Sequence, residues 1–216
     1  MNITRGEGTK TGVTTTRERA SGPPGDRGGR PSATSPHALA AAAQRLFIEH
    51  GFEAVSVEDV TAAVGVSRRT FFRYFATKAD VLWVESPAEL ARLRTALADV
   101  SPAVAYQDAV TEAVVSVLDH PARDIEWARH RAQLVLTVPA VQAHASLVYA
   151  EWRAVAGGFA ARWSGQPASA LFPVTVGHAV NAGILAAHEL WIGHPDSSLP
   201  EALRATLGLV LPPSPG

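Results

Sequence analysis

Cysteine is absent from this chain of 216 residues. Disulfide bonds, thiolate zinc sites and a cysteine nucleophile are therefore excluded, and the composition suits the reducing cytoplasm, where we expect the protein to act. No apolar run of signal-peptide length stands near the start, and each later apolar stretch is interrupted by His, Glu, Arg or Pro before it could span a bilayer. The sequence thus predicts a soluble protein with no membrane partner.

Familiar enzyme motifs are absent as well. The sequence contains no His-Glu-x-x-His, no Gly-x-Ser-x-Gly, no phosphate-binding loop and no dinucleotide-binding fingerprint. Among the eight His residues, His178 and His188 fall on one expected helix, where a structural histidine is the more common case. We therefore expect no enzyme, no cofactor and no metal site. An enzyme remains one alternative, and a helical interaction protein is another.

Neither sign of charge dominates, because Lys plus Arg number 19 and Asp plus Glu number 20. The whole molecule is therefore not marked as a nucleic-acid binder. The distribution is uneven: residues 1–35 carry six basic and three acidic groups, residues 36–80 carry five of each, and residues 81–216 carry eight and twelve, or net +3, 0 and −4. The front of the chain is basic and the back is acidic.

Residues 1–34 contain almost no large apolar side chain and are rich in Gly, Thr, Pro, Ser and Arg. Such a segment cannot bury enough surface to offset its ordering entropy, so we predict a disordered N-terminal arm. Two roles stay open for it. Arg27 and Arg30 could enter the minor groove of DNA, or the segment could be a solvated tail, which we favour because three acidic residues dilute its charge.

Residues 35–82 carry start and stop signals for four closely spaced helices, the fourth of them long. The signals are Ser35-Pro36 and Gly51, Ser56 with Asp59 and Gly65, Ser67, and Thr77 with Asp80. Apolar residues recur between them at helical spacing. We predict a compact domain here, in which Phe71 and Phe75 lie four residues apart on the inner face of the third helix.

The remaining chain, residues 83–212, keeps a helical pattern that is divided by prolines. The interruptions lie at 101–102, 120–121, 138–139, 165–167 and 194–195. Proline is tolerated in the first turn of a helix and disrupts later turns, so each position reads as a helix boundary. No segment alternates like a strand. We predict an all-α fold, with a C-terminal bundle of roughly five helices after the long fourth helix.

Residues 62–67, Ala-Ala-Val-Gly-Val-Ser, have what two tightly crossing helices require: small residues and a Gly that can adopt positive φ. This is a helix-turn-helix pattern, and it leaves the arginines of the third helix facing outward. Such a face suits the major groove, where Arg can bond guanine bidentately. Helix N-termini at Ser56 and Ser67 would favour phosphates, as would Tyr74 and Lys78. The alternative is a solvated basic helix whose aromatic residues only fill the core.

The candidate DNA-binding residues are Ser56, Ser67, Arg68, Arg69, Thr70, Phe72, Arg73, Tyr74 and Lys78. Together with the Gly-Val-Ser turn at residues 65–67 and the Phe-Phe-Arg-Tyr-Phe run at residues 71–75, they resemble the DNA-binding domain of the Tet repressor family over residues 36–82. Phe72 stands where the family usually has Tyr, and Arg69 where a small residue is frequent. Phe72 lacks the hydroxyl that such a Tyr could offer to DNA, and Arg69 implies a base preference different from that of those relatives.

The resemblance implies an all-helical homodimer that binds a palindromic operator in double-stranded DNA, represses transcription, and holds a small-molecule effector in its C-terminal domain. Residues 131–144, 149–153 and 177–179 are similar to regulators found with mycofactocin biosynthesis genes. That similarity implies an acyl-CoA-like or other lipid-like effector. From the residues themselves, an apolar cavity would favour a large apolar or amphipathic molecule.

Several large side chains of the middle helices are candidates for that cavity, although each alone is more often a core residue. They are Trp127, His130, Leu134, Tyr149, Trp152, Phe159 and His178. The dimer interface is expected on two further helices, 168–191 and 199–211, because the first is rich in Gly and Ala that permit close approach. The alternative for these small residues is packing within one chain.

Overall fold

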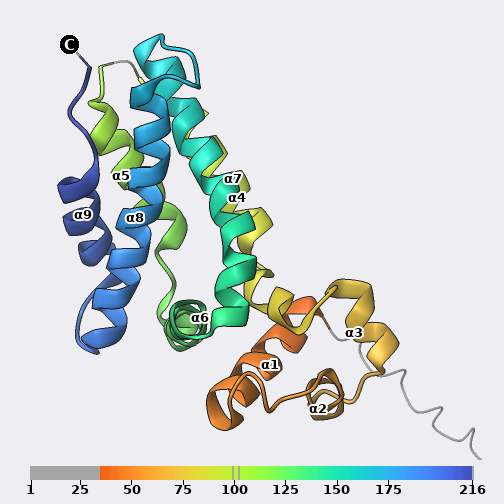
Figure 1. The fold of residues 1–216 in the computed structure, drawn as a ribbon. Helices are drawn as coiled ribbons and strands as arrows, with labels where there is room; N and C mark the ends of the chain where they lie inside the picture. Colours follow the sequence, from red (N-terminus) through yellow and green to blue (C-terminus); the bar gives the residue numbers. More distant parts are fainter. Residues whose placement is uncertain (1–34, 99, 102, 216) are drawn as a thin grey trace, which may run out of the picture. The chain divides into compact units, whose positions relative to one another are not determined.

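The computed structural model describes residues 35–98, 100–101 and 103–215. Every regular element in this part of the chain is a helix (Figure 1), as the sequence predicts. The expected disordered arm, with Arg27 and Arg30, lies outside the described residues.

The first three helices are α1 (Pro36–His50), α2 (Val57–Ala63) and α3 (Arg68–Tyr74). Their start signals are confirmed. The Ser35 hydroxyl accepts the Ala38 N–H at 3.1 Å, and Ser67 does the same for the Thr70 N–H at 3.2 Å. Ser56 and Asp59 form a complete capping box at the start of α2. Each cap satisfies backbone donors that the first turn leaves free, and it thereby fixes where the helix begins.

The prediction of one long fourth helix from Thr77 is wrong. A 3-10 helix, η1 (Lys78–Trp83), is followed by a turn and then by α4 (Ser86–Ala98). The reason lies at Pro87, which has no backbone N–H for the carbonyl of Trp83 and therefore cannot continue a helix from the preceding segment. The predicted cap does form, since the Asp80 carboxylate accepts the Thr77 N–H at 2.8 Å.

The C-terminal helices are α5 (Tyr106–Leu118), α6 (Ile125–Thr137), α7 (Pro139–Ser164), α8 (Leu171–Gly193) and α9 (Leu199–Val210), with a short 3-10 turn η2 (Ala122–Asp124) before α6. Five α-helices thus follow α4, as predicted, and the boundaries at 120–121, 138–139, 165–167 and 194–195 are confirmed. The long helices α7 and α8 pack side by side, and α9 packs against α8 (Figure 1).

Two of the small residues of α8 lie at close contacts within the chain, so packing within one chain is confirmed for these two, and the interface with a second protomer stays a prediction. A Cβ at Gly177 would lie 2.7 Å from the Arg153 carbonyl oxygen of α7, and one at Gly183 would lie 2.6 Å from the Leu207 side chain of α9. Although α8 is long and apolar enough to cross a membrane, 56% of that stretch is buried inside the bundle, which is typical of the core helix of a globular protein.

Two apolar clusters hold these helices together. One fills the C-terminal bundle, and the other lies beneath α1, α2 and α3. The second cluster also contains Leu134 and Val135 from α6 and Val141 and Ala145 from α7. The N-terminal helices are therefore packed on the α6–α7 corner through α1 and η1, and α6 contributes to both clusters.

Candidate nucleic-acid interface and effector cavity

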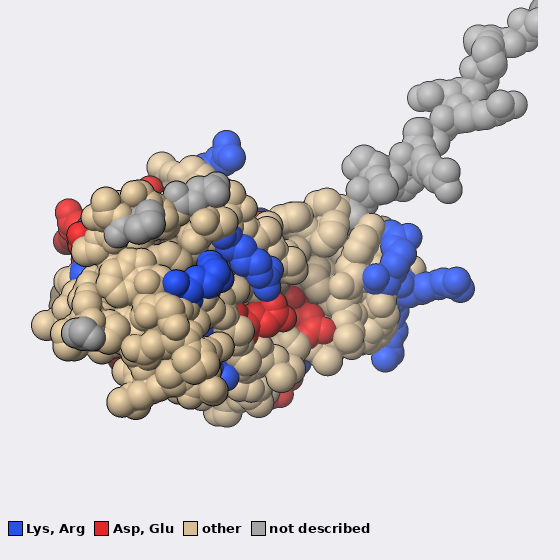
Figure 2. Space-filling model, turned by 90° about the horizontal axis from the view of Figure 1, so that it is seen from above, with Lys and Arg blue, Asp and Glu red and all other residues tan. Residues whose placement is uncertain are grey.

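Two phenylalanines fix the orientation of α3. Phe71 is fully buried and Phe75 is 5% exposed, with their ring centroids 5.4 Å apart. The opposite face carries Arg68, Arg69 and Arg73, all exposed. In Figure 2, a group of basic side chains stands out at the end of the molecule where α3 lies. The sequence prediction of an anchored helix with outward arginines is confirmed.

The three arginines are held differently. Arg68 is paired with Glu58 of α2 at 2.5 Å and lies over the ring of Phe72, its carbon Cζ 5.2 Å from the centroid. Arg73 donates to the Tyr74 hydroxyl at 2.7 Å. Arg69 makes no hydrogen bond or ion pair with the residues that the structure describes. Arg69 is thus the arginine with all of its donors available to a ligand.

The residues expected at phosphates are also at the surface, but several of their polar atoms are already used. The Ser56 hydroxyl donates to the Asp59 carboxylate at 2.6 Å, and this bond lowers the pKa of Asp59. The Ser67 hydroxyl lies 3.0 Å from that of Thr70, which is half-buried. Both serine hydroxyls also cap their helices by accepting the Asp59 and Thr70 N–H groups, so their expected contact with phosphate stays a prediction.

Lys78 has a position that its predicted phosphate role did not anticipate. Its ammonium donates to the carbonyls of Phe52 and Val55 at 2.6 and 3.1 Å and lies 4.4 Å from the Phe52 ring centroid. The side chain is only 23% exposed. Lys78 therefore ties η1 to the α1–α2 connection, and two of its three N–H donors are used inside the protein.

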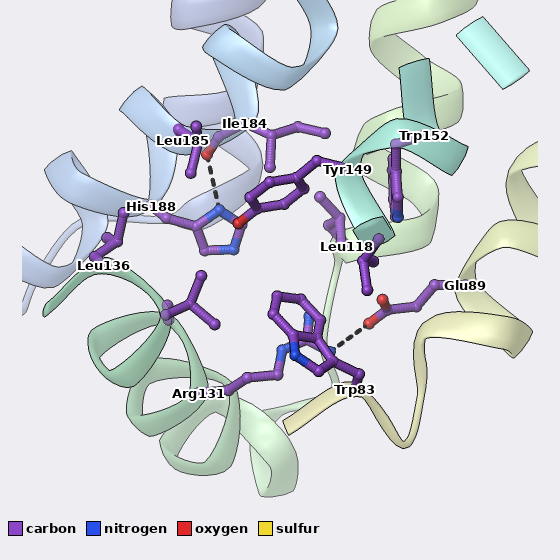
Figure 3. A pocket seen from close by; sticks show the side chains of 13 residues that line it. Trp83, Glu89, Leu118, Arg131, Leu136, Tyr149, Trp152, Ile184, Leu185 and His188 are labelled. Atoms are coloured by element: carbon purple, nitrogen blue, oxygen red, sulfur yellow. Dashed lines mark hydrogen bonds and ion pairs between the residues drawn. The ribbon is translucent and has the colours of Figure 1, made fainter. Parts of the chain in front are cut away.

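A cavity of about 40 Å³ lies inside the C-terminal bundle (Figure 3). Helices α4, α6, α7 and α8 supply most of its walls, and Trp83 of η1 and Leu118 of α5 complete them. The lining residues are Trp83, Glu89, Leu118, Arg131, Ala132, Val135, Leu136, Val148, Tyr149, Trp152, Ile184, Leu185 and His188.

The structure brings only two of the sequence candidates to this cavity, Tyr149 and Trp152. The other candidates, Trp127, His130, Leu134, Phe159 and His178, lie outside its lining. With its amide in the orientation that its neighbours favour, Gln44 of α1 bonds both the carbonyl and the indole nitrogen of Trp127, at 3.2 and 3.0 Å. Leu134 belongs to the core beneath the helix-turn-helix, Phe159 to the bundle core, and His178 is exposed on α8.

Charged and polar groups that sequence reasoning missed define the cavity. Arg131 of α6 donates to Glu89 of α4 at 2.8 Å, and both residues are buried. Burial lowers the pKa of His188 to about 4 and raises that of Tyr149 to about 12, because enclosure disfavours the charged form. The signal that was available is that Arg131 and Glu89 each interrupt the apolar face of a helix.

One buried donor at the cavity has no partner. The indole nitrogen of Trp83 is enclosed but makes no hydrogen bond with the described residues. The imidazole of His188, by contrast, is fixed through Nδ1, which lies 2.8 Å from the Ile184 carbonyl oxygen. No cluster of three or more His, Asp or Glu side chains placed to hold a metal occurs within the described ranges.

Comparison with known proteins gives matches over most of the chain. Residues 39–82 match a family model described as bacterial regulatory proteins, tetR family, and residues 104–215 match one described as the MftR C-terminal domain. A mycofactocin biosynthesis transcriptional regulator, MftR, of Mycobacterium tuberculosis is 35% identical over 85% of this chain and 93% of its own length.

Solved structures share the fold at lower identity. The Thermus thermophilus repressor FadR, crystallised with lauroyl-CoA, is 21% identical and matches 84% of this chain and 100% of its own with a TM-score of 0.56. A TetR-family regulator from Rhodococcus sp. is 16% identical over 82% of this chain and 98% of its own, with a TM-score of 0.54.

Proposed function

This chain belongs to the tetR family of bacterial regulatory proteins, and from that premise we propose that it is a cytoplasmic, homodimeric repressor that releases its operator when a small apolar or amphipathic molecule binds. The observation that carries the proposal is the geometry of α3. Phe71 and Phe75 anchor the helix from beneath, so that its exposed arginines project from a rigid support. A short helix presented in this way fits the major groove.

Homodimer formation is supported by apolar side chains that the described chain leaves uncovered. Leu171 of α8 and Leu209 of α9 are each 85% exposed, and Val174 and Val210 lie near them in sequence at 45% and 38%. Leu171 and Val174 are three residues apart and share one side of α8. Two such helix pairs related by a two-fold axis would cover these side chains and place two copies of α3 on a palindromic site.

The cavity supports an effector that changes the shape of the protein when it binds. A space of about 40 Å³ holds one or two water molecules, whereas drug-sized ligands occupy about 300 Å³ or more. Binding would therefore push apart α4, α6, α7 and α8. Because Val135 and Trp83 line the cavity and also pack at the core of the helix-turn-helix, this expansion would reposition α3. A fatty acyl thioester is one suitable class, and the FadR relative was crystallised with lauroyl-CoA.

Selection of bound fragments from random double-stranded DNA would identify the operator and test the proposal. We expect one inverted repeat, strong loss of affinity with rising salt, and a large preference for the repeat over unrelated DNA. Arg69→Ala should weaken operator binding by about 1–3 kcal/mol, which is roughly 5- to 150-fold. Arg162→Ala removes the same charge from the exposed face of α7 and is the matched control.

Two results would contradict the DNA-binding proposal: selection that enriches no sequence, or equal losses for Arg69→Ala and Arg162→Ala. The first of these would favour a helical interaction protein instead. The effector part of the proposal is tested separately, by mass spectrometry of molecules that copurify with the protein from a cell extract. Recovery of small polar solutes alone would refute an apolar or amphipathic effector.

A further inference from the structure

The cavity holds a charge arrangement that bears on the chemistry of the effector. Of the described residues that line it, Arg131 is the one that carries a permanent positive charge. The residue as a whole is 7% exposed, and its guanidinium donates to the Glu89 carboxylate through a single nitrogen, Nη1. A guanidinium has five N–H donors in a planar fork, so this contact uses a small part of its capacity.

A second buried donor belongs to a residue that lines the same cavity. The indole N–H of Trp83 is buried and makes no hydrogen bond with the described residues, and Trp83 lines the cavity with Arg131. Buried donors are nearly always paired, so an orphaned one at a cavity points to an absent acceptor. Figure 3 shows the Arg131–Glu89 pair at one edge of the cavity, with Tyr149 and His188 across from it.

Glu89 stands at the wall between this cavity and an open groove. It lines both spaces, and the groove, of about 620 Å³, also carries His37 of α1, Arg92 of α4, and His120 and Arg123 near η2. The groove also holds Glu85, Asp119 and Asp124, so a Glu89 carboxylate displaced from Arg131 would enter a solvated environment that contains both signs of charge. This exit matters because a buried carboxylate that loses its cation without another partner is strongly destabilised.

We propose that the effector is an apolar molecule with a carboxylate head group, and that this carboxylate replaces Glu89 on Arg131 while Trp83 donates its free N–H to it. Exchange of one carboxylate for another keeps the buried guanidinium paired with an anion, whereas a neutral head group, such as the thioester of an acyl-CoA, could not replace Glu89 without leaving Arg131 unpaired. Since Glu89 belongs to α4, which follows η1 and the helix-turn-helix, its move into the groove links binding to the position of α3. This inference rests on the proposed effector function.

The test uses the full-length protein without DNA, so that its outcome is independent of operator binding. Dodecanoate, methyl dodecanoate, dodecan-1-ol and lauroyl-CoA are titrated separately, and binding is followed by tryptophan fluorescence, since Trp83 and Trp152 line the cavity. We expect dodecanoate to bind at least about tenfold more tightly than the other three probes, because its carboxylate can make a charge-assisted hydrogen bond with Arg131.

Glu89→Gln is the decisive variant because it removes the competing charge but keeps an oxygen acceptor for Arg131. It should raise the affinity for dodecanoate about tenfold and leave dodecan-1-ol unchanged. Glu112→Gln is the matched control, since Glu112 is an exposed carboxylate paired with Arg204 at 2.7 Å and lies outside the cavity lining. It should change neither affinity. Arg131→Gln should abolish the preference for dodecanoate, provided that circular dichroism shows the variant to be folded.

Several outcomes would overturn the proposal. For the natural protein, these are equal binding of dodecanoate and dodecan-1-ol, and no binding of any probe. For Glu89→Gln, it is dodecanoate binding that is unchanged or weaker than in the natural protein. Tighter binding of lauroyl-CoA than of dodecanoate, with no effect of Glu89→Gln, would overturn it as well. Each of them leaves the operator measurements intact. A protein that binds dodecanoate as expected but enriches no DNA sequence would instead refute the repressor proposal and retain the exchange at Arg131.

Discussion

Two adjacent glycines of α7 allow a sharp test of how closely α7 and α8 pack. A Cβ at Gly157 would lie 2.9 Å from the carbonyl oxygen of Pro173, a backbone atom of α8. A Cβ at Gly158 would meet only the flexible end of Arg162, at 3.8 Å. The substitutions Gly157→Ala and Gly158→Ala are therefore chemically identical, lie next to each other in one helix, and differ in the space that receives the methyl group.

The expected free energies follow from this difference. Alanine is favoured over glycine within a helix by about 1 kcal/mol, so Gly158→Ala should stabilise the protein by up to that amount. Gly157→Ala has the same intrinsic gain, but the two helices must separate by about 0.5 Å to restore an ordinary contact of 3.4 Å. Forced expansion of a packed interior costs about 1–3 kcal/mol. The two variants should thus differ by about 1–3 kcal/mol.

Guanidinium denaturation followed by circular dichroism measures the free energy of unfolding of both variants and of the natural protein, at one protein concentration. The same slope with denaturant in all three is the control for comparable native and unfolded states. Equal stability of the two variants, or a Gly157→Ala protein more stable than Gly158→Ala, would refute the close α7–α8 contact.

Three further predictions concern buried polar groups. The pKa of His188 is about 4 in the folded protein and 6.5 when unperturbed, so the unfolded chain binds the extra proton first. His188 should therefore lower the free energy of unfolding by up to about 3 kcal/mol as the pH falls from 6.5 through 4. In denaturation measured at each pH, His188→Gln should lose this part of the pH dependence, whereas the same change at exposed His178 should not. Lys78→Met should lower the free energy of unfolding by about 1–3 kcal/mol in denaturant titration, since two half-buried carbonyls lose a charged donor, and an unchanged value would show that water replaces the ammonium. Gln44→Leu should cost about 1–3 kcal/mol by leaving the indole N–H of half-buried Trp127 unpaired, and retention of full stability would contradict that pairing.

Local signals in the sequence were sufficient for the helix-turn-helix. Ser56, Ser67 and Asp59 act on backbone groups within one helical turn, and Phe71 and Phe75 are four residues apart, so both caps and the inward face of α3 could be predicted from neighbours in the chain. The break after Trp83 was missed although its cause, Pro87, is also local. The favourable cap at Thr77 indicated where a helix begins but not that this helix ends at Trp83.

The residues of the cavity depend on contacts that sequence spacing does not reveal. Arg131 and Glu89 are 42 positions apart, and nothing in either segment specifies the other as partner. The small residues of α8 show the same limit, because glycine permits close approach by any helix. The sequence could not tell whether α7, α9 or a second protomer would fill the space beside Gly177.

The α6–α7 corner has a consequence for anyone who would isolate the DNA-reading portion of this protein. Leu134, Val135, Val141 and Ala145 belong to the apolar cluster beneath α1, α2 and α3, yet they lie at least 69 positions after Gly65, at the turn between α2 and α3. A fragment that stops at residue 82 would expose the apolar residues that these four cover. The packing of α1, α2 and α3 thus depends on the whole fold, and these helices cannot be moved to another protein without the α6–α7 corner that supports them.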